Sequence, residues 1–215
     1  MKIDNILFLS LESEPITLTF KELRLSGHPL SIIWKNYCRY IMNGGNGFTD
    51  ETFEILWYDK APFVPEFCKI KTIFLGIESG GELVQKELVG SEKEILTSLN
   101  KTFDKVSNKG SLIAGWNIKN YDLPLIHKRF YINKIIPNDV LPKYDTKPWE
   151  VKSFFDIKEF WNGSLSKGIN TIDAFYYSFV NDADPSLIED TFGGVNAKNK
   201  IIKMYQIMKE LGDIN

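Results

Sequence analysis

The clearest hydrophobic pattern of the chain lies near its beginning. Four apolar residues at 6–9 are followed by an alternation of apolar and polar residues that ends at Glu12. A continuous apolar run of this length indicates a buried strand, and the alternation indicates that the end of the strand is polar on one face. Successive side chains of a strand point to opposite faces, so Ser10 and Glu12 are expected to point the same way.

From residue 69 onward the pattern becomes regular and predicts a mixture of strands and helices. The predicted elements are, in order, a strand at 69–78, a hairpin turn at Gly80 and Gly81, a strand at 82–90, a helix that begins with the capping box Ser91–Glu94, a buried strand at 111–115 and a helix at 122–133. The core face of the capped helix is predicted to carry Ile95, Leu96, Leu99 and Phe103. This order favours an α/β fold with a mixed central sheet flanked by helices.

Residues 1–215 are expected to form a single domain with a helical insertion at about 17–67. One helix of the insertion is entered at Pro29, and its predicted apolar stripe is Leu30, Ile33, Trp34, Tyr37 and Ile41. A second helix is predicted to be capped by Thr49 or Asp50 and to run through Tyr58. Two further helices are predicted in the C-terminal third, one from Thr171 and one over about 196–211.

Composition limits the classes of function. The chain has 26 Lys and Arg against 28 Asp and Glu, a net charge of −2, so no global positive field attracts nucleic acid and any such binding must be local. The two cysteines, Cys38 and Cys68, lack metal-ligand spacing, which fits a reducing compartment. Without a leader pattern or an apolar run of about 18 residues, the expected location is the cytoplasm, with no membrane partner.

Two segments resemble motifs of a known enzyme superfamily. Residues 5–15, NILFLSLESEP, and 115–130, GWNIKNYDLPLIHKRF, resemble the first two motifs of the DEDD (DnaQ-like) 3′-5′ exonucleases. The closest likeness is to predicted exonucleases of bacteria and phages that are related to the proofreading domain of family B DNA polymerases, with a weaker echo at 147–161. This resemblance implies an RNase H-like exonuclease fold.

The resemblance also implies a site in which four carboxylates hold two divalent ions, Mg²⁺ or Mn²⁺, for phosphodiester hydrolysis. The first motif falls on Ser10 and Glu12, and the second on Asp122 with Asn117 as its companion. The third motif, a helical Tyr followed four residues later by Asp, is matched by Tyr205 and Lys209. Ser10 and Lys209 therefore replace two expected aspartates, and Glu12 and Asp122 are the remaining candidate metal ligands.

A lysine in place of an aspartate reverses the sign of the interaction with a metal ion. At an effective dielectric constant of about 20, a unit charge about 4 Å from a divalent ion is worth roughly 8 kcal/mol. We therefore expect a catalytically degenerate exonuclease-like protein, a pseudoenzyme without a cofactor. The alternative is an active metal-dependent 3′-5′ exonuclease for single-stranded DNA or RNA that recruits one more acid, Asp156 or Asp190.

Each candidate site residue also has an ordinary explanation. Glu12 would be a solvated acid at a strand end, and Asp122 would cap the helix that follows it. Asn117 would be a turn residue, and Tyr205 would serve packing.

The residues around the second motif suggest where a nucleic acid could bind. Trp116 and Tyr121 could stack on an unpaired base, although core packing explains at least one of them. The lysines and arginine that could contact phosphates are Lys119, Lys128, Arg129 and Lys134, with Lys198, Lys200 and Lys203 on the last helix. A solvated helix face in a lysine-rich protein is the favoured explanation for them. The expected partners are single-stranded nucleic acid or a protein assembly, such as a replication complex or, for a phage protein in the host cytoplasm or virion, the phage particle.

Overall fold

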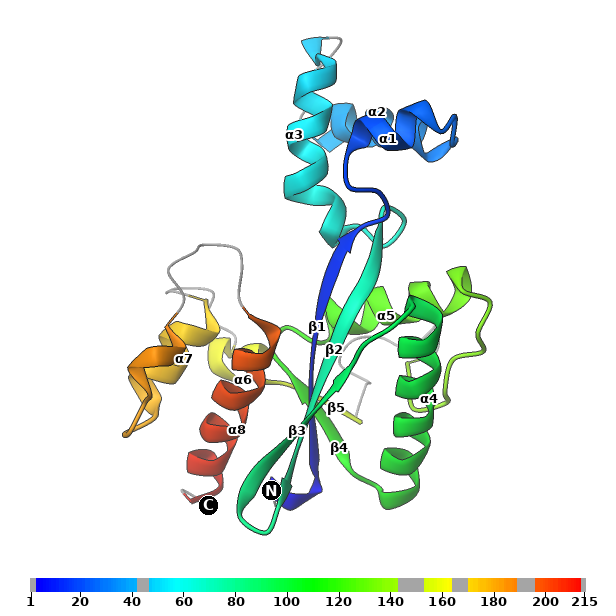
Figure 1. Cartoon of the computed structure of the whole chain (residues 1–215). Coiled ribbons are helices and arrows are strands. Elements are labelled where there is room, and N and C mark those ends of the chain that lie inside the picture. The colour runs from blue at the N-terminus through cyan, green and yellow to red at the C-terminus, as the bar shows by residue number, and fades with distance from the viewer. Residues whose placement is uncertain (1–2, 42–46, 143–152, 164–169, 189–195, 214–215) are drawn as a thin grey trace. The chain divides into compact units, whose positions relative to one another are not determined.

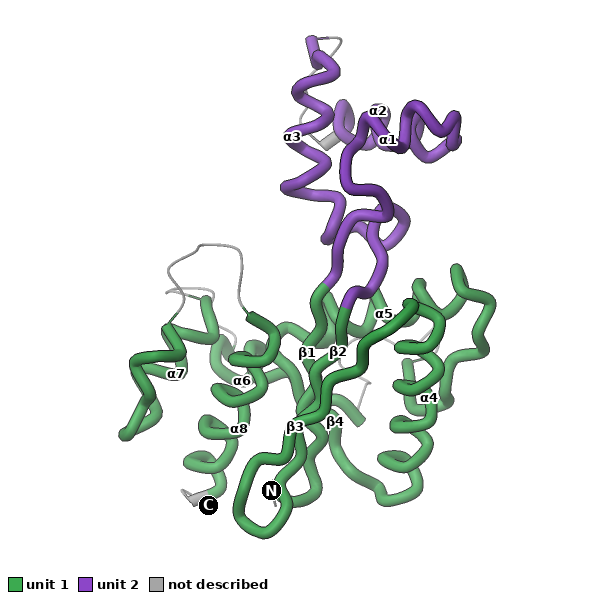
Figure 2. Tube along the Cα trace, viewed as in Figure 1, with its two compact units in different colours: residues 1–12, 72–215 green, residues 13–71 purple. Residues whose placement is uncertain are grey.

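The computed structural model describes residues 3–41, 47–142, 153–163, 170–188 and 196–213. The chain forms two compact units (Figure 2). Unit 1 consists of Met1–Glu12 and Thr72–Asn215, and unit 2 consists of Ser13–Lys71. The insertion predicted at about 17–67 lies within unit 2. No helix in the described part of the chain is long and apolar enough to cross a membrane.

Unit 1 is built on a mixed five-stranded sheet. Its strands are β1 (Ile6–Pro15), β2 (Cys68–Ser79), β3 (Glu82–Leu88), β4 (Leu112–Gly115) and β5 (Phe154–Asp156). Two strands continue into unit 2, which contains the residues of β1 after Glu12 and those of β2 before Thr72. The spatial order is β3-β2-β1-β4-β5. The β2–β3 hairpin is antiparallel, whereas β4 is parallel to both β1 and β5. The predicted α/β class with a mixed sheet is confirmed.

Helices cover both faces of this sheet (Figure 1). One side carries α4 (Glu92–Lys109) and α5 (Asp122–Ile132), and the other carries α6 (Ile157–Asn162), α7 (Ile172–Phe179) and α8 (Ala197–Asp213). Short 3-10 turns, η1 (Ile3–Asn5) and η5 (Pro185–Leu187), complete the unit. The predicted capping box, Ser91 with Glu94, begins α4, and all four residues predicted for its core face are buried.

Close packing fixes α8 against the sheet. A Cβ atom on Gly76 of β2 would lie 2.4 Å from Cγ2 of Ile201, so the absence of a side chain at Gly76 lets the helix approach. The ring of Tyr205 meets Phe8 of β1 edge to face, with 6.1 Å between ring centroids. Lys203 is fully buried in an ion pair with Asp173 of α7, so its ammonium group is not available to a phosphate.

Unit 2 has its own aromatic core. Its elements are α1 (Phe20–Leu25), α2 (Leu30–Ile41), α3 (Asp50–Lys60) and the 3-10 turn η3 (Ala61–Phe63). The core side chains are Phe20, Leu23, Trp34, Cys38, Phe53, Leu56, Trp57, Ala61 and Phe67. The stripe predicted for α2 is wrong at Ile33, which is 52% exposed, because the buried face of the helix is centred on Trp34 and Cys38.

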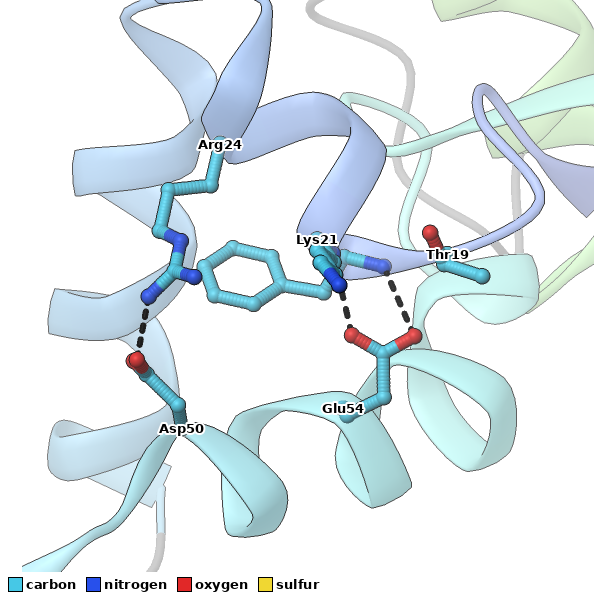
Figure 3. Close-up of a pocket in the computed structure, with 6 residues that line it drawn as sticks. Thr19, Lys21, Arg24, Asp50 and Glu54 are labelled. Atoms are coloured by element: carbon cyan, nitrogen blue, oxygen red, sulfur yellow. Dashed lines mark hydrogen bonds and ion pairs between the residues drawn. The ribbon is translucent and has the colours of Figure 1, made fainter.

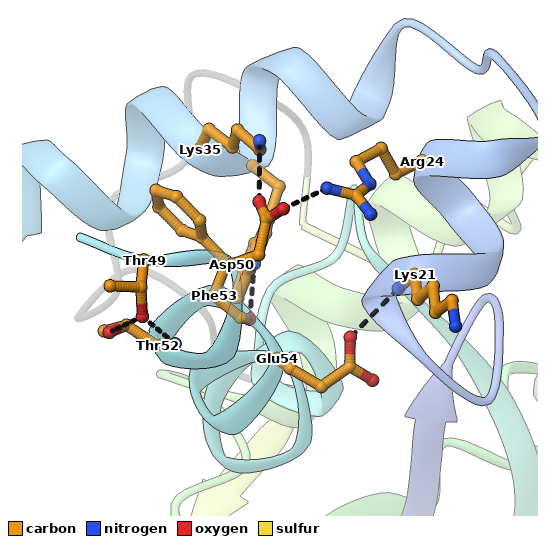
Figure 4. A network of polar contacts seen from close by, with 9 residues as sticks. Lys21, Arg24, Lys35, Thr49, Asp50, Thr52, Phe53 and Glu54 are labelled. Carbon is orange, nitrogen blue, oxygen red and sulfur yellow. Dashed lines mark hydrogen bonds and ion pairs between the residues drawn. The ribbon is translucent and has the colours of Figure 1, made fainter.

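Polar contacts hold the three helices of unit 2 together (Figure 4). Asp50, at the start of α3, pairs with Arg24 of α1 and, at 3.1 Å, with Lys35 of α2. These hydrogen bonds, from Lys35 first and then Arg24, lower the pKa of Asp50. Glu54 accepts the backbone N–H groups of Phe20 and Lys21 at the beginning of α1.

Candidate functional site

The candidate site lies where β4 and β5 end, beside the middle of β1. Because β4 is parallel to both neighbours, the carboxyl ends of β4 and β5 lie at one edge of the sheet, and β1 runs on past them to Pro15. Ser10 is buried in the middle of β1, and Glu12, two residues later, is partly exposed. The strand alternation that was predicted from the sequence therefore places a hydroxyl and a carboxylate on one face at this edge.

Asp122 is the first residue of α5, and its carboxyl group is buried, with 5% of the residue exposed. Burial raises the pKa of Asp122 to about 7. The positive charge of Lys200 opposes this rise, whereas the negative charge of Asp156 adds to it. Hydrogen bonds from the backbone N–H groups of Asp122 and Leu11 also favour the ionised form. At neutral pH the carboxyl group is thus close to half protonated.

Asp156 ends β5 and caps α6. Its Oδ1 accepts the N–H groups of Lys158 and Glu159, which begin the helix. The same carboxylate also accepts hydrogen bonds from the loop after β4. Its Oδ1 accepts the backbone N–H group of Asn117 at 3.0 Å, and its Oδ2 accepts the backbone N–H group of Lys119 at 3.1 Å. Burial raises the pKa of Asp156, and the backbone hydrogen bonds oppose that rise. Its lone pairs are largely committed to holding the β4–α5 loop and α6 in place.

Asn117 shapes that loop. It adopts a left-handed conformation, with φ of 59°, which Asn tolerates better than most residues. Its carbonyl oxygen accepts the N–H groups of Asn120 and Tyr121. The turn that Asn117 makes leads directly into Asp122, so the structure accounts for Asn117 as the turn residue of the second motif.

The lysine whose charge lowers the pKa of Asp122 is Lys200. Lys200 lies in the first turn of α8 and is partly exposed. Tyr205 and Lys209 lie about 8 Å and 14 Å farther along the helix axis, at about 1.5 Å per residue. The hydroxyl of Tyr205 donates to the carbonyl oxygen of Gly81 at 3.2 Å, and Lys209 lies over the Tyr205 ring, 6.0 Å from its centroid. In the structure Tyr205 and Lys209 thus contact β1, the β2–β3 turn and each other, and their assignment to the third motif stays a prediction.

The other candidate residues differ in their surroundings. The ammonium group of Lys119 pairs with Glu159 at 2.7 Å. Arg129 is buried and binds both carboxylate oxygens of Glu92, at 2.8 and 2.5 Å, so it has a structural role. Trp116 packs against the hydrophobic core beside α8, as the packing explanation anticipated. Tyr121 is partly exposed and Lys128 is exposed. Asp190, the other acid considered, lies outside the described residues.

The sequence contains a local signal for the position of Asp156 but none for that of Lys200. Asp156 and Glu159 have the spacing of a helix start, an N-cap acid followed three residues later by Glu, and this would have placed Asp156 at a strand-to-helix junction. Lys200 carries no such signal, because its position depends on how α8 packs against the sheet.

The acids at this edge are Glu12, Asp122 and Asp156. Across the residues that the structure describes, no three Asp, Glu, His or Cys side chains gather as a metal site would need. The chemistry of the donors agrees: Asp122 resists ionisation, Asp156 is bound by four backbone N–H groups, and Lys200 adds a positive charge. Two ions of charge +2 need carboxylates to offset their mutual repulsion.

Unit 2 contains a separate pocket of about 350 Å³ (Figure 3). It is lined by Thr19, Phe20, Lys21, Arg24, Asp50 and Glu54. Both of its carboxylates are engaged, Asp50 by Arg24 and Lys35 and Glu54 by the N–H groups that begin α1. Because these groups satisfy one another, the pocket offers no convergent set of free polar groups, and the edge at Asp122 is the stronger candidate.

Comparison with known proteins gave no match: neither the scan against protein-family models nor the search of curated proteins found one.

Proposed function

We propose that unit 1 is an RNase H-like domain of the exonuclease type whose site has lost the ability to hold two metal ions, so that the protein binds single-stranded nucleic acid without cutting it. The observation that carries this proposal is that the positive charge of Lys200 acts on the buried Asp122. In the site that the resemblance implies, four carboxylates hold two divalent ions.

The order of elements supports the family part of the proposal. The first strand is followed by the β2–β3 hairpin, then α4, β4 and α5, which is the order expected of the RNase H-like mixed sheet. The two motif segments are also in contact, which supports the proposal, since the N–H group of Leu11, between Ser10 and Glu12, bonds to Asp122.

The electrostatics support the loss of metal binding. A metal ligand must be deprotonated, and a carboxyl group with a pKa of about 7 gives up its proton less readily than an ordinary aspartate. Lys200 repels a cation by an amount similar to the attraction that an aspartate would supply, roughly 8 kcal/mol at about 4 Å and an effective dielectric constant of about 20. Ser10 contributes an uncharged hydroxyl group.

A positive charge at this edge suits a phosphate group instead. Lys200 could contact the backbone of a single strand electrostatically, and the partly exposed Tyr121 could stack on a base. Binding of this kind falls as salt rises. A salt-dependent mobility shift with an oligonucleotide, weakened in Lys200→Ala, is expected. A stable protein partner together with no shift would favour a docking role in a protein assembly.

An active exonuclease is the second candidate, and one observation favours it. The charge of Asp156 raises the pKa of Asp122, so these two acids lie near enough to act together on one metal ion. Incubation of a labelled single strand with Mg²⁺ or Mn²⁺ separates the two proposals. An intact strand supports the degenerate site. Stepwise shortening from the 3′ end that disappears in Glu12→Ala would establish the enzyme.

Reversal of the changes tests where the third motif lies. Ser10→Asp combined with Lys200→Asp is expected to create Mn²⁺ binding that calorimetry detects, because it adds two negative charges and removes one positive charge next to Asp122. The matched control is Ser10→Asp combined with Lys209→Asp, which changes the net charge equally but, on α8, acts about 14 Å away from Lys200. Equal binding by both double variants would show that Lys200 is not the critical cation.

A further inference from the structure

β3 is an edge strand of the sheet in unit 1, and its outer side carries unused backbone groups. Gly80 and Gly81 have φ angles of 65° and 88° and form a two-residue turn, with Ser79 paired to Glu82. In such a hairpin the residues that flank the turn exchange both hydrogen bonds, and every second residue does the same. Glu82, Val84 and Lys86 thus bond to β2, and the backbone groups of 83, 85 and 87 point outward.

These outward groups remain open in the part of the chain that the structure describes. The backbone N–H and C=O groups of Leu83, Gln85 and Glu87 make no hydrogen bond there. The side chain of Gln85 bonds to the carbonyl oxygen of Lys198, which leaves its backbone groups unused. In Figure 1, β3 lies at the front of the sheet, with α4 and α8 to either side. An open edge of this kind is a template for another strand.

The exposed face of β3 has a self-complementary pattern. Glu82, Val84 and Lys86 alternate along the strand, and all three side chains are exposed. The charges are of opposite sign and stand two residues on either side of Val84, which is 50% exposed. On β2, Ile77 lies opposite Val84 and is 46% exposed, so a small apolar patch lies between the charges.

We infer that β3 binds β3 of a second copy of this chain, antiparallel and centred on Val84, to form a continuous sheet across a two-fold axis. In this register Leu83 lies opposite Gln85 of the other copy, and their outward N–H and C=O groups exchange hydrogen bonds in both directions. Glu82 lies opposite Lys86 of the other copy, twice by symmetry. Ile77 and Val84 of both copies form one apolar row.

The neighbouring register lacks this complementarity. Outward groups also pair when the two-fold axis passes through Gln85, but Val84 then lies opposite Lys86, and Leu83 lies opposite Glu87. Neither pair joins opposite charges. Isolated charges on an edge strand normally discourage pairing, whereas charges placed symmetrically about an apolar centre select one register and one partner. A second copy is the partner that presents this same pattern.

Sedimentation analysis of the full chain over a range of concentrations tests the inference. A dimer that dissociates on dilution is expected. Glu82→Lys and Lys86→Glu should each weaken association about tenfold or more, because each places like charges opposite each other twice. An equimolar mixture of the two variants should associate again, since one variant then presents two lysines and the other two glutamates. A wild-type chain that stays monomeric throughout, or a mixture no better than either variant alone, overturns the inference.

A backbone variant tests the edge independently of charge. Gln85→Pro removes an outward N–H group without removing a bond to β2, and proline is tolerated on an edge strand. It should abolish the dimer, whereas the matched Gln85→Ala, which also loses the contact with Lys198, should retain it. Circular dichroism checks that both variants fold. Equal dimerisation by Gln85→Pro and Gln85→Ala would place the interface elsewhere.

Discussion

Asp122 is the residue in which burial and charge conflict most directly. Its unfolded-state pKa is close to the ordinary value of 3.8, and its folded-state pKa is about 7. Between these values the folded chain holds a proton that the unfolded chain has lost. This group should therefore lower the free energy of unfolding by on the order of 4 kcal/mol as pH rises from about 4 to about 7. Above pH 7 its contribution should stay level.

Asp122→Asn should remove this part of the pH dependence. The amide is uncharged at every pH, and its oxygen can still accept the N–H group of Leu11. The variant is expected to be more stable than the wild type at pH 8, by a few kcal/mol, and about equally stable at pH 4. Urea unfolding at both pH values measures the difference. A wild type and variant with parallel pH profiles would contradict the assigned burial of an ionisable group.

Lys200 should act on the same carboxyl group. Since its positive charge lowers the pKa of Asp122, Lys200→Met should raise that pKa further, whereas Lys209→Met, at the far end of the helix, should leave it unchanged. Carboxyl carbon chemical shifts in an NMR titration report the pKa directly. An equal effect of both substitutions would place Lys200 too far from Asp122 for the role given to it.

At the residue scale, local patterns predicted some of the site and missed the rest for a physical reason. The alternation at Ser10 and Glu12 and the junction at Asn117 and Asp122 depend on a few adjacent residues, so the sequence could identify them. Whether Lys200 or Lys209 faces Asp122 depends on how far α8 slides along the sheet. The two residues lie nine positions apart, or 2.5 turns, and therefore on opposite sides of α8, so the choice also depends on how the helix is rotated about its axis.

At the scale of elements, α7 and α8 are joined by a buried ion pair. Lys203 has no exposed side-chain surface, and Asp173 has 25% exposed. Asp173→Asn should cost about 3 kcal/mol of unfolding free energy because it leaves a buried ammonium group without a partner. Lys203→Met should cost less, since water can still reach Asp173. Chemical denaturation of both single variants and of the double variant checks this order, and an equal cost for both would contradict it.

The contact of α8 with β2 depends on Gly76. Gly76→Ala should destabilise unit 1 by about 1 to 3 kcal/mol, because the added methyl group would overlap Ile201. Adding Ile201→Ala should recover part of the lost stability by making space. Thermal unfolding of the single and double variants measures this coupling, and an unchanged melting temperature in Gly76→Ala would show that the helix does not approach so closely.

Elements with strong local signals were predictable, and those defined by tertiary contacts were less so. The capping box of α4, the glycine turn between β2 and β3 and the N-cap of α3 at Thr49 are confirmed. In α2 the sequence offers apolar residues on nearly every side, so Ile33 was assigned to the core, although the buried face carries Ser31, Trp34 and Cys38. A choice among several apolar faces requires knowledge of the neighbouring helices.

For the whole molecule, the formal charge of −2 makes any attraction to nucleic acid weak and local. The proposed binding should therefore be lost at moderate salt, unlike that of a strongly basic protein. The proposal for unit 1 depends on one electrostatic claim. The claim is that Asp122, which resists ionisation, and Asp156, which is hydrogen-bonded to backbone N–H groups, cannot hold two divalent ions beside the positive charge of Lys200.

Calorimetric titration of the native chain with Mn²⁺ at pH 7.5, with Asp122→Asn as the matched control, tests that claim most directly. The account predicts no binding that depends on Asp122, so the native chain and the variant should give the same heats. Binding of two ions per chain in the native protein, abolished by Asp122→Asn, would contradict it.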